Sequence, residues 1–390
     1  MISCLDMNKC CGCGACINIC QRKAISMKPD IYGFDYPVVD EDLCINCGKC
    51  VSVCQIENKN ISLNNPVKCF AAVNKNKDVL KTSSSGGVFG QLADFVLKQN
   101  GVVFGCRFDN NIVPVHTYTE NLEEIVSFQG SKYVQSKTGE AFLQVKRFLE
   151  ENRLVLFTGT PCQVAGLLTF LGKAYINLLT ADLSCHGVPS YGFFKDYILY
   201  LERKYKIKIT DFRFRGKYDG WGKTIRLQYL LKNKIKHRYI QDYNSYYVMG
   251  FIKRQIMRES CYQCSYMRNE RIGDFTMCDY WGAEKQHPEI NSANGISAFL
   301  VNTEKGMKAL EMIQKGIDLY PSKLEKIIKQ NGSLREAAQK PPEREKILSL
   351  WQKYGCEKLD KEYMASSHKY RIKRAILRKI PKRIKRMIKR

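Results

Sequence analysis

Short hydrophobic runs alternate with helical patterns along most of the chain after Pro66. Such runs occur at Val102 to Phe104, Leu154 to Phe157 and Ile296 to Val301, each beside a stretch with the spacing of an amphipathic helix. This alternation is typical of an α/β domain. We therefore predict an α/β domain over residues 66–340.

Residues 1–62 have a different pattern, in which cysteines recur at fixed spacing. The motif C-x2-C-x2-C-x3-C occurs twice, 34 positions apart, and Gly14 recurs as Gly48. Two residues between cysteines let a loop wrap one corner of a 4Fe-4S cubane while backbone N–H groups point at the sulfides. The two runs are Cys10, Cys13, Cys16 and Cys20, followed by Cys44, Cys47, Cys50 and Cys54.

This module resembles the bacterial two-cluster ferredoxins, in which three cysteines of one run share a cluster with the fourth of the other. The resemblance assigns Cys10, Cys13, Cys16 and Cys54 to one cluster, and Cys44, Cys47, Cys50 and Cys20 to the second. Gln21 and Gln55 stand where that family usually has proline, which stiffens the turn but is not a ligand. We expect the absence of proline to affect the reduction potential of the clusters more than their binding.

A zinc module is the alternative for this segment. Zinc takes four ligands in two separated pairs, whereas these cysteines form triplets plus one, which favours iron-sulfur clusters. Cys4 and Cys11 are left over. We expect an ordinary role without metal for each of them.

Two loops of the larger domain combine glycine or hydroxyl residues with the start of a predicted helix. Ser83 to Gly87 precede a helix whose apolar face runs through Val88, Leu92 and Val96. Such a loop can seat a phosphate or pyrophosphate, and it serves equally well as a plain helix cap.

The second loop carries a cysteine. Thr158 to Cys162 separate a predicted strand from a predicted helix over residues 163–171. A cysteine at a helix start has a depressed pKa because the helix dipole favours thiolate, which suits a nucleophile or a metal ligand. A buried inert cysteine is the alternative. Cys185 follows the next strand-like segment, and Cys261 and Cys264 come later, so these four thiols together can form a third cluster site, or a zinc site.

Five motifs in the larger domain resemble the flavoprotein family of coenzyme F-420 hydrogenase and dehydrogenase beta subunits. The motifs lie at Ser83 to Phe89, Gly130 to Ser136, Thr158 to Gln163, Cys185 to Ser190, and Asp279 to Gly282. Together they extend over residues 66–315. The resemblance implies FAD, a third 4Fe-4S cluster, and electron transfer between clusters and a two-electron substrate, which in methanogens is a deazaflavin.

The resemblance also implies site residues. It makes Cys162, Cys185, Cys261 and Cys264 the ligands of the third cluster. Candidate FAD contacts are Ser83, Ser85, Gly86, Gly87, Gly130, Lys132, Gly159 and Thr160. Cys278 stands where the family often has glycine, and we expect it to be a passive neighbour instead of a rival ligand. No catalytic residue is assigned, and His186 and His287 are expected to be structural.

Composition sets the class and the expected compartment. Hydrophobic residues make up 44% of the chain, which suits a globular protein. Eighteen cysteines with no signal-peptide pattern predict a reducing cytoplasm, and no apolar run approaches the roughly 18 residues of a membrane span.

The formal net charge of +25 is concentrated at the C-terminus. Residues 369–390 contain twelve Lys or Arg and no acid, so +25 − 12 = +13 remains for the rest. Isoleucines recur every four residues from Ile372 to Ile388, and Pro381 is a predicted kink. A basic amphipathic helix of this kind lies on anionic membrane surfaces, with a solvated or RNA-attracted tail as the alternative. Aromatic side chains for base stacking are nearly absent, so we expect no specific nucleic acid.

The sequence thus predicts an α+β ferredoxin-like module over residues 1–62, an α/β flavin-binding domain over residues 66–340, and a helical basic tail over residues 341–390. We expect a cytoplasmic iron-sulfur flavoenzyme, located at the inner face of the membrane through its tail, that reduces or oxidises a small organic substrate. That substrate is deazaflavin-like or an intermediate of surface polysaccharide or lipid synthesis. The alternative is an electron-transfer subunit that serves a redox partner protein or ferredoxin without turnover of its own.

Overall fold

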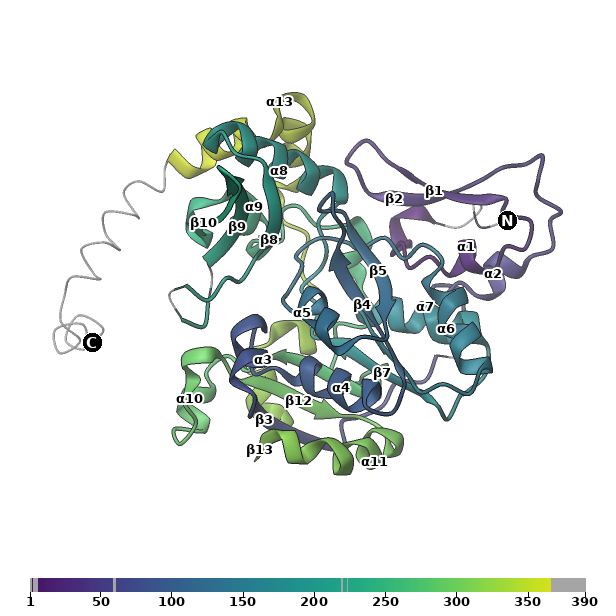
Figure 1. Cartoon of the computed structure of the whole chain (residues 1–390). Coiled ribbons are helices and arrows are strands. Elements are labelled where there is room, and N and C mark those ends of the chain that lie inside the picture. The colour runs from purple at the N-terminus through teal and green to yellow at the C-terminus, as the bar shows by residue number, and fades with distance from the viewer. Residues whose placement is uncertain (1, 3–5, 59–60, 219, 223, 366–390) are drawn as a thin grey trace.

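The computed structural model describes residue 2 and residues 6–58, 61–218, 220–222 and 224–365. Figure 1 shows three parts: a small N-terminal domain, a large sheet with helices on both faces, and a smaller sheet next to the long helix α13. No helix within these ranges is long and apolar enough to cross a membrane.

The N-terminal domain has the arrangement expected of a small ferredoxin-like module. Two short helices contact each other beside an antiparallel pair of strands. Their bounds are α1 Ala15–Ile19, β1 Ile25–Pro29, β2 Asp35–Val39 and α2 Lys49–Ser52. Gly14 and Gly48 precede the helices with φ of 85° and 75°, a left-handed conformation that glycine adopts without strain.

The large domain is built on a mixed sheet of eight strands in the order β13-β3-β12-β11-β7-β6-β4-β5. The four neighbouring strands β11, β7, β6 and β4 are parallel, and the strands on either side of them pair antiparallel. The strands are β3 Lys68–Asn74, β4 Val102–Phe108, β5 Pro114–Thr119, β6 Val155–Thr158, β7 Leu178–Leu183, β11 Phe275–Asp279, β12 Ser297–Val301 and β13 Ile317–Ser322. Most positions of the central parallel strands β6 and β7 are buried, as parallel strands covered on both faces require.

Helices cover both faces of this sheet. α4 (Val88–Leu97) and α11 (Glu304–Ile313) share one apolar core with it, while α6 (Ala141–Glu150) and α7 (Pro161–Leu171) share another, which also includes Ala15 of α1. The N-terminal domain is therefore packed onto the α6 and α7 side. The shorter helices are α3 Lys77–Thr82, α5 Ile125–Phe128, α10 Ala283–Gln286 and α12 Leu324–Ile328.

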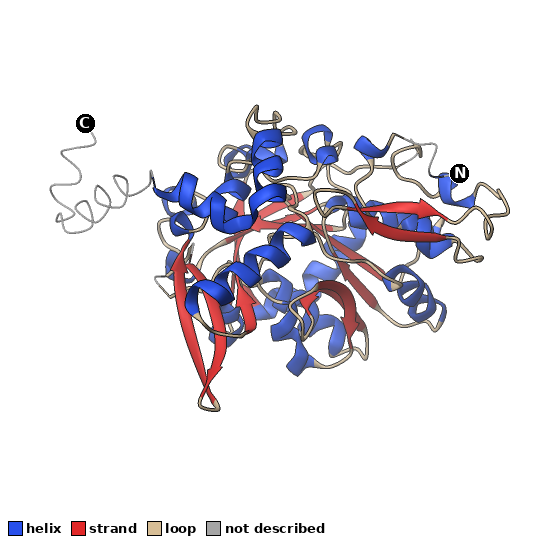
Figure 2. Cartoon of the chain, turned by 90° about the horizontal axis from the view of Figure 1, so that it is seen from above, coloured by secondary structure: helices blue, strands red, loops and turns tan. Residues whose placement is uncertain are grey.

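A separate antiparallel sheet in the order β10-β9-β8 forms the third part. Its strands are β8 Ile209–Arg213, β9 Thr224–Leu231 and β10 Lys234–Gln241. They pack with α8 (Tyr191–Tyr205), α9 (Tyr246–Ile252) and α13 (Arg344–Ala365) around an aromatic core. Figure 2 shows the β9–β10 hairpin projecting from this end of the molecule.

The predicted strands and helices of the large domain are present with small changes of boundary. The helix predicted over residues 163–171 begins earlier, at Pro161, because proline fits the first helical position. Ile347, Leu348 and Leu359 of α13 are buried in the aromatic core, so residues 344–365 pack as part of the folded chain. The basic segment 369–390, with its predicted amphipathic helix, lies outside the described residues, and so does Cys4.

Candidate functional site

The eight N-terminal cysteines gather around two separate cavities. Cys20, Cys44, Cys47 and Cys50 line one of about 100 Å³. Cys10, Cys13, Cys16 and Cys54 line another of about 30 Å³. The structure thus groups the thiols as the ferredoxin resemblance pairs them. We call the first set the outer quartet, since Cys47 is exposed to solvent, and the second set the inner quartet.

The donor chemistry of both quartets suits an iron-sulfur cluster. Apart from the thiols, the cavity walls consist of apolar, amide and glycine residues with Arg22 and Lys49, and they contain no carboxylate or histidine. Sulfur-only donor sets are typical of zinc or iron-sulfur sites. Within the described ranges, no three or more His, Cys, Asp or Glu side chains form a group that could hold a single metal ion.

The four downstream thiols that the resemblance singles out lie near one another. The charge of the Cys162 thiolate acts on Cys185, Cys261 and Cys264, and Cys261 and Cys264 also act on Cys185. Burial raises the pKa of Cys185, Cys261 and Cys264, the last to about 11. These residues, with Cys162, form what we call the third quartet. Cys162 is near the start of α7, as predicted, although inside the first turn and not at its boundary.

Contacts between α1 and α7 bring the inner quartet next to the third quartet. Gly166 of α7 makes the approach possible, because a Cβ atom at this position would lie 2.8 Å from the Cys13 sulfur. Gln55 connects the two sets: its side-chain amide donates to the Cys11 sulfur at 3.1 Å and to the carbonyl of Cys162. The two quartets are therefore neighbours within one packed interface.

Cys11 has a more specific position than its sequence context indicated. Its thiol hydrogen-bonds to both Cys13 and Cys162, and these bonds raise the pKa of Cys11 well above its usual value. The bond to Cys162 is the main reason that the pKa of Cys162 is lowered, and the bond to Cys13 is the main reason that the pKa of Cys13 falls to about 6. Cys11 therefore lies between a ligand candidate of the inner quartet and one of the third. In the sequence, only the position of Cys11 next to Cys10 could have indicated that it lies between the two quartets.

A fully buried arginine lies at the same interface, and no sequence pattern indicated it. Arg258 donates from Nε to the carbonyl of Cys10 at 2.7 Å, and from Nη1 to Gln135 Oε1 at 3.0 Å. Its Nη2 donates to the carbonyl of Asp35 at 2.9 Å, and the guanidinium lies over the Tyr36 ring at 4.1 Å. The positive charge lowers the pKa of Cys10 and of Cys162, although burial still raises that of Cys10 overall.

The third quartet opens onto a cavity with a volume of about 660 Å³. The cavity lies at the carboxyl ends of the parallel strands, where β6 ends at Thr158, β7 at Leu183 and β11 at Asp279. Ligands of open α/β sheets bind at this edge. Cys162 and Cys185 are in its wall, so thiols and cavity belong to one site.

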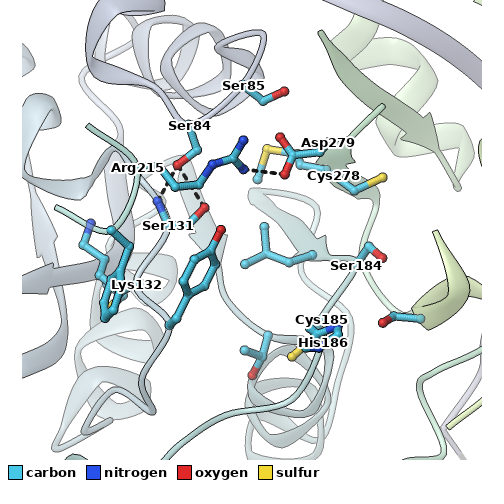
Figure 3. A pocket seen from close by; sticks show the side chains of 18 of the residues that line it. Ser84, Ser85, Ser131, Lys132, Ser184, Cys185, His186, Arg215, Cys278 and Asp279 are labelled. Carbon is cyan, nitrogen blue, oxygen red and sulfur yellow. Dashed lines mark hydrogen bonds and ion pairs between the residues drawn. The ribbon is translucent and has the colours of Figure 1, made fainter. Parts of the chain in front are cut away.

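The cavity wall across from the thiols is rich in hydroxyl groups and helix starts. Ser84 Oγ accepts a hydrogen bond from the backbone N–H of Ser131 at 2.6 Å and is 2.9 Å from Ser131 Oγ (Figure 3). The first residues of α4 and of α7 both line the cavity. Gly87 precedes α4 with φ of 80° and provides no side-chain cap, which leaves the first N–H groups of the helix open to a ligand.

Seven of the eight predicted FAD contacts line this cavity: Ser83, Ser85, Gly87, Gly130, Lys132, Gly159 and Thr160. Gly86 does not, and a Cβ atom there would lie 2.0 Å from the carbonyl oxygen of Ala72, so this glycine permits close packing on β3. The Lys132 ammonium donates to the carbonyls of Ser127, Phe128 and Gln129 at the end of α5. Its charge is held by protein groups, and burial lowers its pKa to about 8.

Arg215 and its neighbours form a basic and aromatic part of the wall that the sequence analysis missed. Arg215 is buried, pairs with Asp279 (Figure 3), and donates from Nε to the carbonyl of Gly222 at 3.1 Å. Its Nη2 is buried without a hydrogen-bond partner among the described residues. The Trp281 ring lies 5.4 Å from the guanidinium and stacks on Trp221 at 4.7 Å.

Two histidines and Cys278 also lie near this cavity. Burial lowers the pKa of His186 and of His116 to about 4, so both rings are neutral near pH 7. Cys278 lines the cavity, and its thiol lies 3.8 Å from the carbonyl of Ala298. Its pKa is raised, mainly by burial, with Asp279 as the next cause. The third-quartet thiols are not among the main groups that influence it.

Two parts of the chain match known protein families. Residues 9–58 match the family described as "4Fe-4S dicluster domain", so the chain is an iron-sulfur protein with a two-cluster N-terminal domain. Residues 152–326 match the family that describes the C terminus of the beta subunit of coenzyme F420 hydrogenase/dehydrogenase. The chain therefore joins a dicluster domain to a C-terminal domain of the F420 hydrogenase/dehydrogenase beta-subunit family, which confirms the resemblance found in the sequence.

The chain is only distantly similar to one chain of a solved structure. One similar chain comes from the structure titled "Xenon derivatization of the F420-reducing [NiFe] hydrogenase complex from Methanosarcina barkeri". The two sequences are 15% identical, the alignment covers 79% of this chain and 94% of that one, and the TM-score is 0.44. No curated protein matches the chain.

Proposed function

We propose that this chain is an iron-sulfur flavoprotein oxidoreductase that binds FAD in the 660 Å³ cavity and a third 4Fe-4S cluster at the third quartet. The observation that supports this most strongly is the continuous sequence of sites: outer quartet, inner quartet, third quartet, cavity. FAD, when bound, exchanges two electrons with an organic substrate and single electrons with a cluster, and so supplies the conversion between them. The substrate is a small organic molecule, deazaflavin-like or an intermediate of surface polymer synthesis.

The hydroxyl-rich wall fits the anionic part of such a cofactor. Backbone N–H groups at the start of α4, together with the Ser84 and Ser131 hydroxyls, offer donors of the kind that bind a pyrophosphate. Nη2 of Arg215, which has no hydrogen-bond partner among the described residues, is a further donor for an anion of the cofactor or substrate. We do not assign this contact to Lys132, because three carbonyls already accept from its ammonium.

The cavity is large enough and apolar enough to hold a planar ring system beside the thiols. Its volume is within the range of about 300–1,000 Å³ that is typical of ligand sites. The neutral side chain of His186 and the backbone of Gly187 lie in the wall next to Cys185. We assign no proton donor, since burial lowers the pKa of His186 far enough to keep it uncharged near pH 7, and its ring nitrogen is 3.2 Å from the carbonyl of Ile252.

The test of the flavin site compares FAD retention in two variants. Replacement of Ser84 and Ser131 by alanine removes two hydroxyl groups from the cavity, and we expect anaerobically purified protein to bind FAD about tenfold more weakly or worse. Thr210→Ala is the control, because this hydroxyl lies on β8 and, among the described residues, donates only to the carbonyl of Gln228. Equal FAD affinity in both variants would contradict the assignment of the hydroxyl-rich wall.

A second experiment distinguishes an enzyme from a subunit that serves a partner. Purified protein with reduced viologen as donor is mixed with candidate acceptors, including a deazaflavin. Turnover by the chain alone supports an oxidoreductase in its own right. Reduction of the bound flavin without turnover, followed by turnover when a partner protein is added, supports the electron-transfer subunit.

The proposed membrane association of the tail is tested separately. Removal of residues 369–390 takes away twelve basic residues, each worth about 1 kcal/mol near anionic headgroups. We expect the full chain to float with vesicles that contain phosphatidylglycerol and the truncated chain to float much less. Equal flotation of the two proteins would show that the tail does not contribute.

A further inference from the structure

The β9–β10 hairpin exposes aliphatic side chains at its tip. Its two-residue turn, Lys232 and Asn233, has φ of 50° and 59°, which is the left-handed pair of a tight hairpin turn that suits the twist of the strands. Leu230, Leu231 and Ile235 surround this turn and are 57%, 54% and 60% exposed. Leu230 and Ile235 are cross-strand partners on one face and Leu231 lies on the opposite face, so the end of the hairpin exposes aliphatic side chains on both faces.

The charges around this tip all have the same sign. Residues 224–241 contain five Lys or Arg and no Asp or Glu. Arg226 pairs with Asp211, and Arg238 lies over the Tyr205 ring at 4.3 Å, so both contact the body of the domain. Among the described residues, no carboxylate forms an ion pair with the three lysines nearest the turn, Lys232, Lys234 and Lys236.

We propose that the tip of the β9–β10 hairpin inserts into an anionic membrane surface, with Leu230, Leu231 and Ile235 in the apolar boundary and the lysines at the headgroups. Lysine suits this arrangement because its alkyl stem can lie along apolar surface while the ammonium stays at the polar level. The contact is independent of the tail proposal, because it rests on described residues of the folded domain.

The features of the hairpin disfavour two other kinds of partner, a strand of another protein and a nucleic acid. β10 is an edge strand, and lysines along an edge oppose pairing with a strand of another protein. A nucleic acid would use the basic charge but not three aliphatic side chains, and base stacking needs aromatic rings, of which residues 230–236 contain none. An aromatic pair close to it, Tyr218 and Tyr239, is already stacked at 4.3 Å.

The hairpin belongs to the part of the molecule that contains α13. Figures 1 and 2 show the three-stranded sheet beside this helix. α13 is fixed there, since Tyr363 packs against Tyr246 and Asp360 pairs with Lys204. The hairpin tip therefore projects from a firmly packed part of the folded chain.

The experiment uses the full-length chain and vesicles of phosphatidylcholine with or without phosphatidylglycerol. The test variant carries Leu230→Ser, Leu231→Ser and Ile235→Ser, which keeps every charge. The control carries serine at three other strongly exposed apolar positions, Ile31, Ile176 and Met312. We expect the test variant to float at least fivefold less than the control with anionic vesicles, while heparin binding and the melting temperature stay equal.

A second readout locates the insertion. Leu231→Trp places an indole at the tip, and its emission is expected to shift to shorter wavelength when anionic vesicles are added, whereas Ile176→Trp is expected to show no added shift. Equal flotation of the serine variant and its control, or no shift at Leu231→Trp, would overturn the proposal. Binding to RNA or to an acidic protein that depends on these aliphatic residues, without binding to vesicles, would overturn it too.

Discussion

The outer and inner quartets share one cysteine motif but differ in their surroundings. The outer quartet lies near solvent, where Cys47 is exposed and Lys49 contacts Gln21 at 3.4 Å. The inner quartet is enclosed by Arg258 and Gln55, and by Cys11, which reaches the third quartet. The motif thus determines the ligands, while Cys11 and Gln55 beside it link the inner quartet to the third, and Arg258, far away in the sequence, adds a buried positive charge. This difference suits a point of electron exchange with a partner on one side and an internal step on the other.

Loss of a single ligand from each quartet should have the largest effects, and these effects should differ between the two quartets. Cys13→Ser should remove the inner cluster and stop electron transfer between the outer site and the proposed flavin. Cys47→Ser should remove only the outer cluster, because every residue that lines its cavity belongs to the N-terminal domain. Electron paramagnetic resonance of the reduced proteins measures which signals remain. Loss of the same signals in both variants would contradict the separate roles.

Arg258→Met should have the next largest effect. The change leaves the carbonyls of Cys10 and Asp35 and the Gln135 amide oxygen without their buried donor, so the free energy of unfolding should fall by about 3 kcal/mol or more. A buried positive charge stabilises a reduced cluster, since reduction adds negative charge. The midpoint potentials of the inner cluster and of the proposed third cluster should therefore fall, and that of the outer cluster should not.

Arg258→Lys is the matched variant for this test, because it keeps the charge but loses the planar set of donors. It should restore most of the potential and little of the stability. A redox titration in which all three potentials shift equally would argue against a local effect of Arg258.

Gly166→Ala tests the contact between α7 and the inner quartet. The added methyl group would lie 2.8 Å from the Cys13 sulfur, and we expect a loss of about 1–3 kcal/mol in the free energy of unfolding, with a changed inner-cluster signal. Gly332→Ala is the control, because the nearest atom to a Cβ there is 3.7 Å away. Denaturant unfolding measures both variants, and equal stability would show that the interface can relax.

The smallest expected effect comes from the two glutamines that follow the fourth cysteine of each run. Gln55→Ala loses hydrogen bonds to the Cys11 sulfur and the Cys162 carbonyl, so it should cost about 1–2 kcal/mol. Gln21→Ala loses one exposed contact to Lys49 and should change stability by less than about 0.5 kcal/mol. Thermal unfolding of the two variants under anaerobic conditions checks the difference, and equal melting temperatures would contradict it.

Sequence patterns predicted what is local and repeated, and missed what depends on packing. The cysteine runs, the strands at residues 102–104 and 154–157, and the family motifs were readable because spacing and order carry them. Arg258, Gly166 and Arg215 were not, because no local pattern distinguishes a buried arginine or a contact glycine from an ordinary one. The β9–β10 hairpin was missed as well, since its exposed faces lack the alternation of a half-buried strand.

The same reason explains why most of the predicted FAD contacts line the cavity while Gly86 does not. A glycine-rich loop before a helix predicts an N-terminal site, and Gly87 indeed precedes α4 at the cavity. Sequence could not separate Gly86, which packs on β3, from Gly87, one position later, because only the tertiary arrangement decides which face of the loop is covered. Lys132 could be predicted as an FAD contact for the same reason. Its sequence context does not show that its ammonium already donates to three carbonyls.

The most direct test of the central claim follows electrons along the proposed sequence of sites. Protein reconstituted anaerobically with iron, sulfide and FAD is mixed with a reduced bacterial ferredoxin in a stopped-flow spectrometer, and the flavin absorption is recorded. We predict rapid bleaching of the flavin in the wild-type chain and at least a hundredfold slower bleaching in Cys13→Ser and in Cys162→Ser. Bleaching at the wild-type rate in both variants, or a reconstituted protein that holds no flavin, would contradict the account.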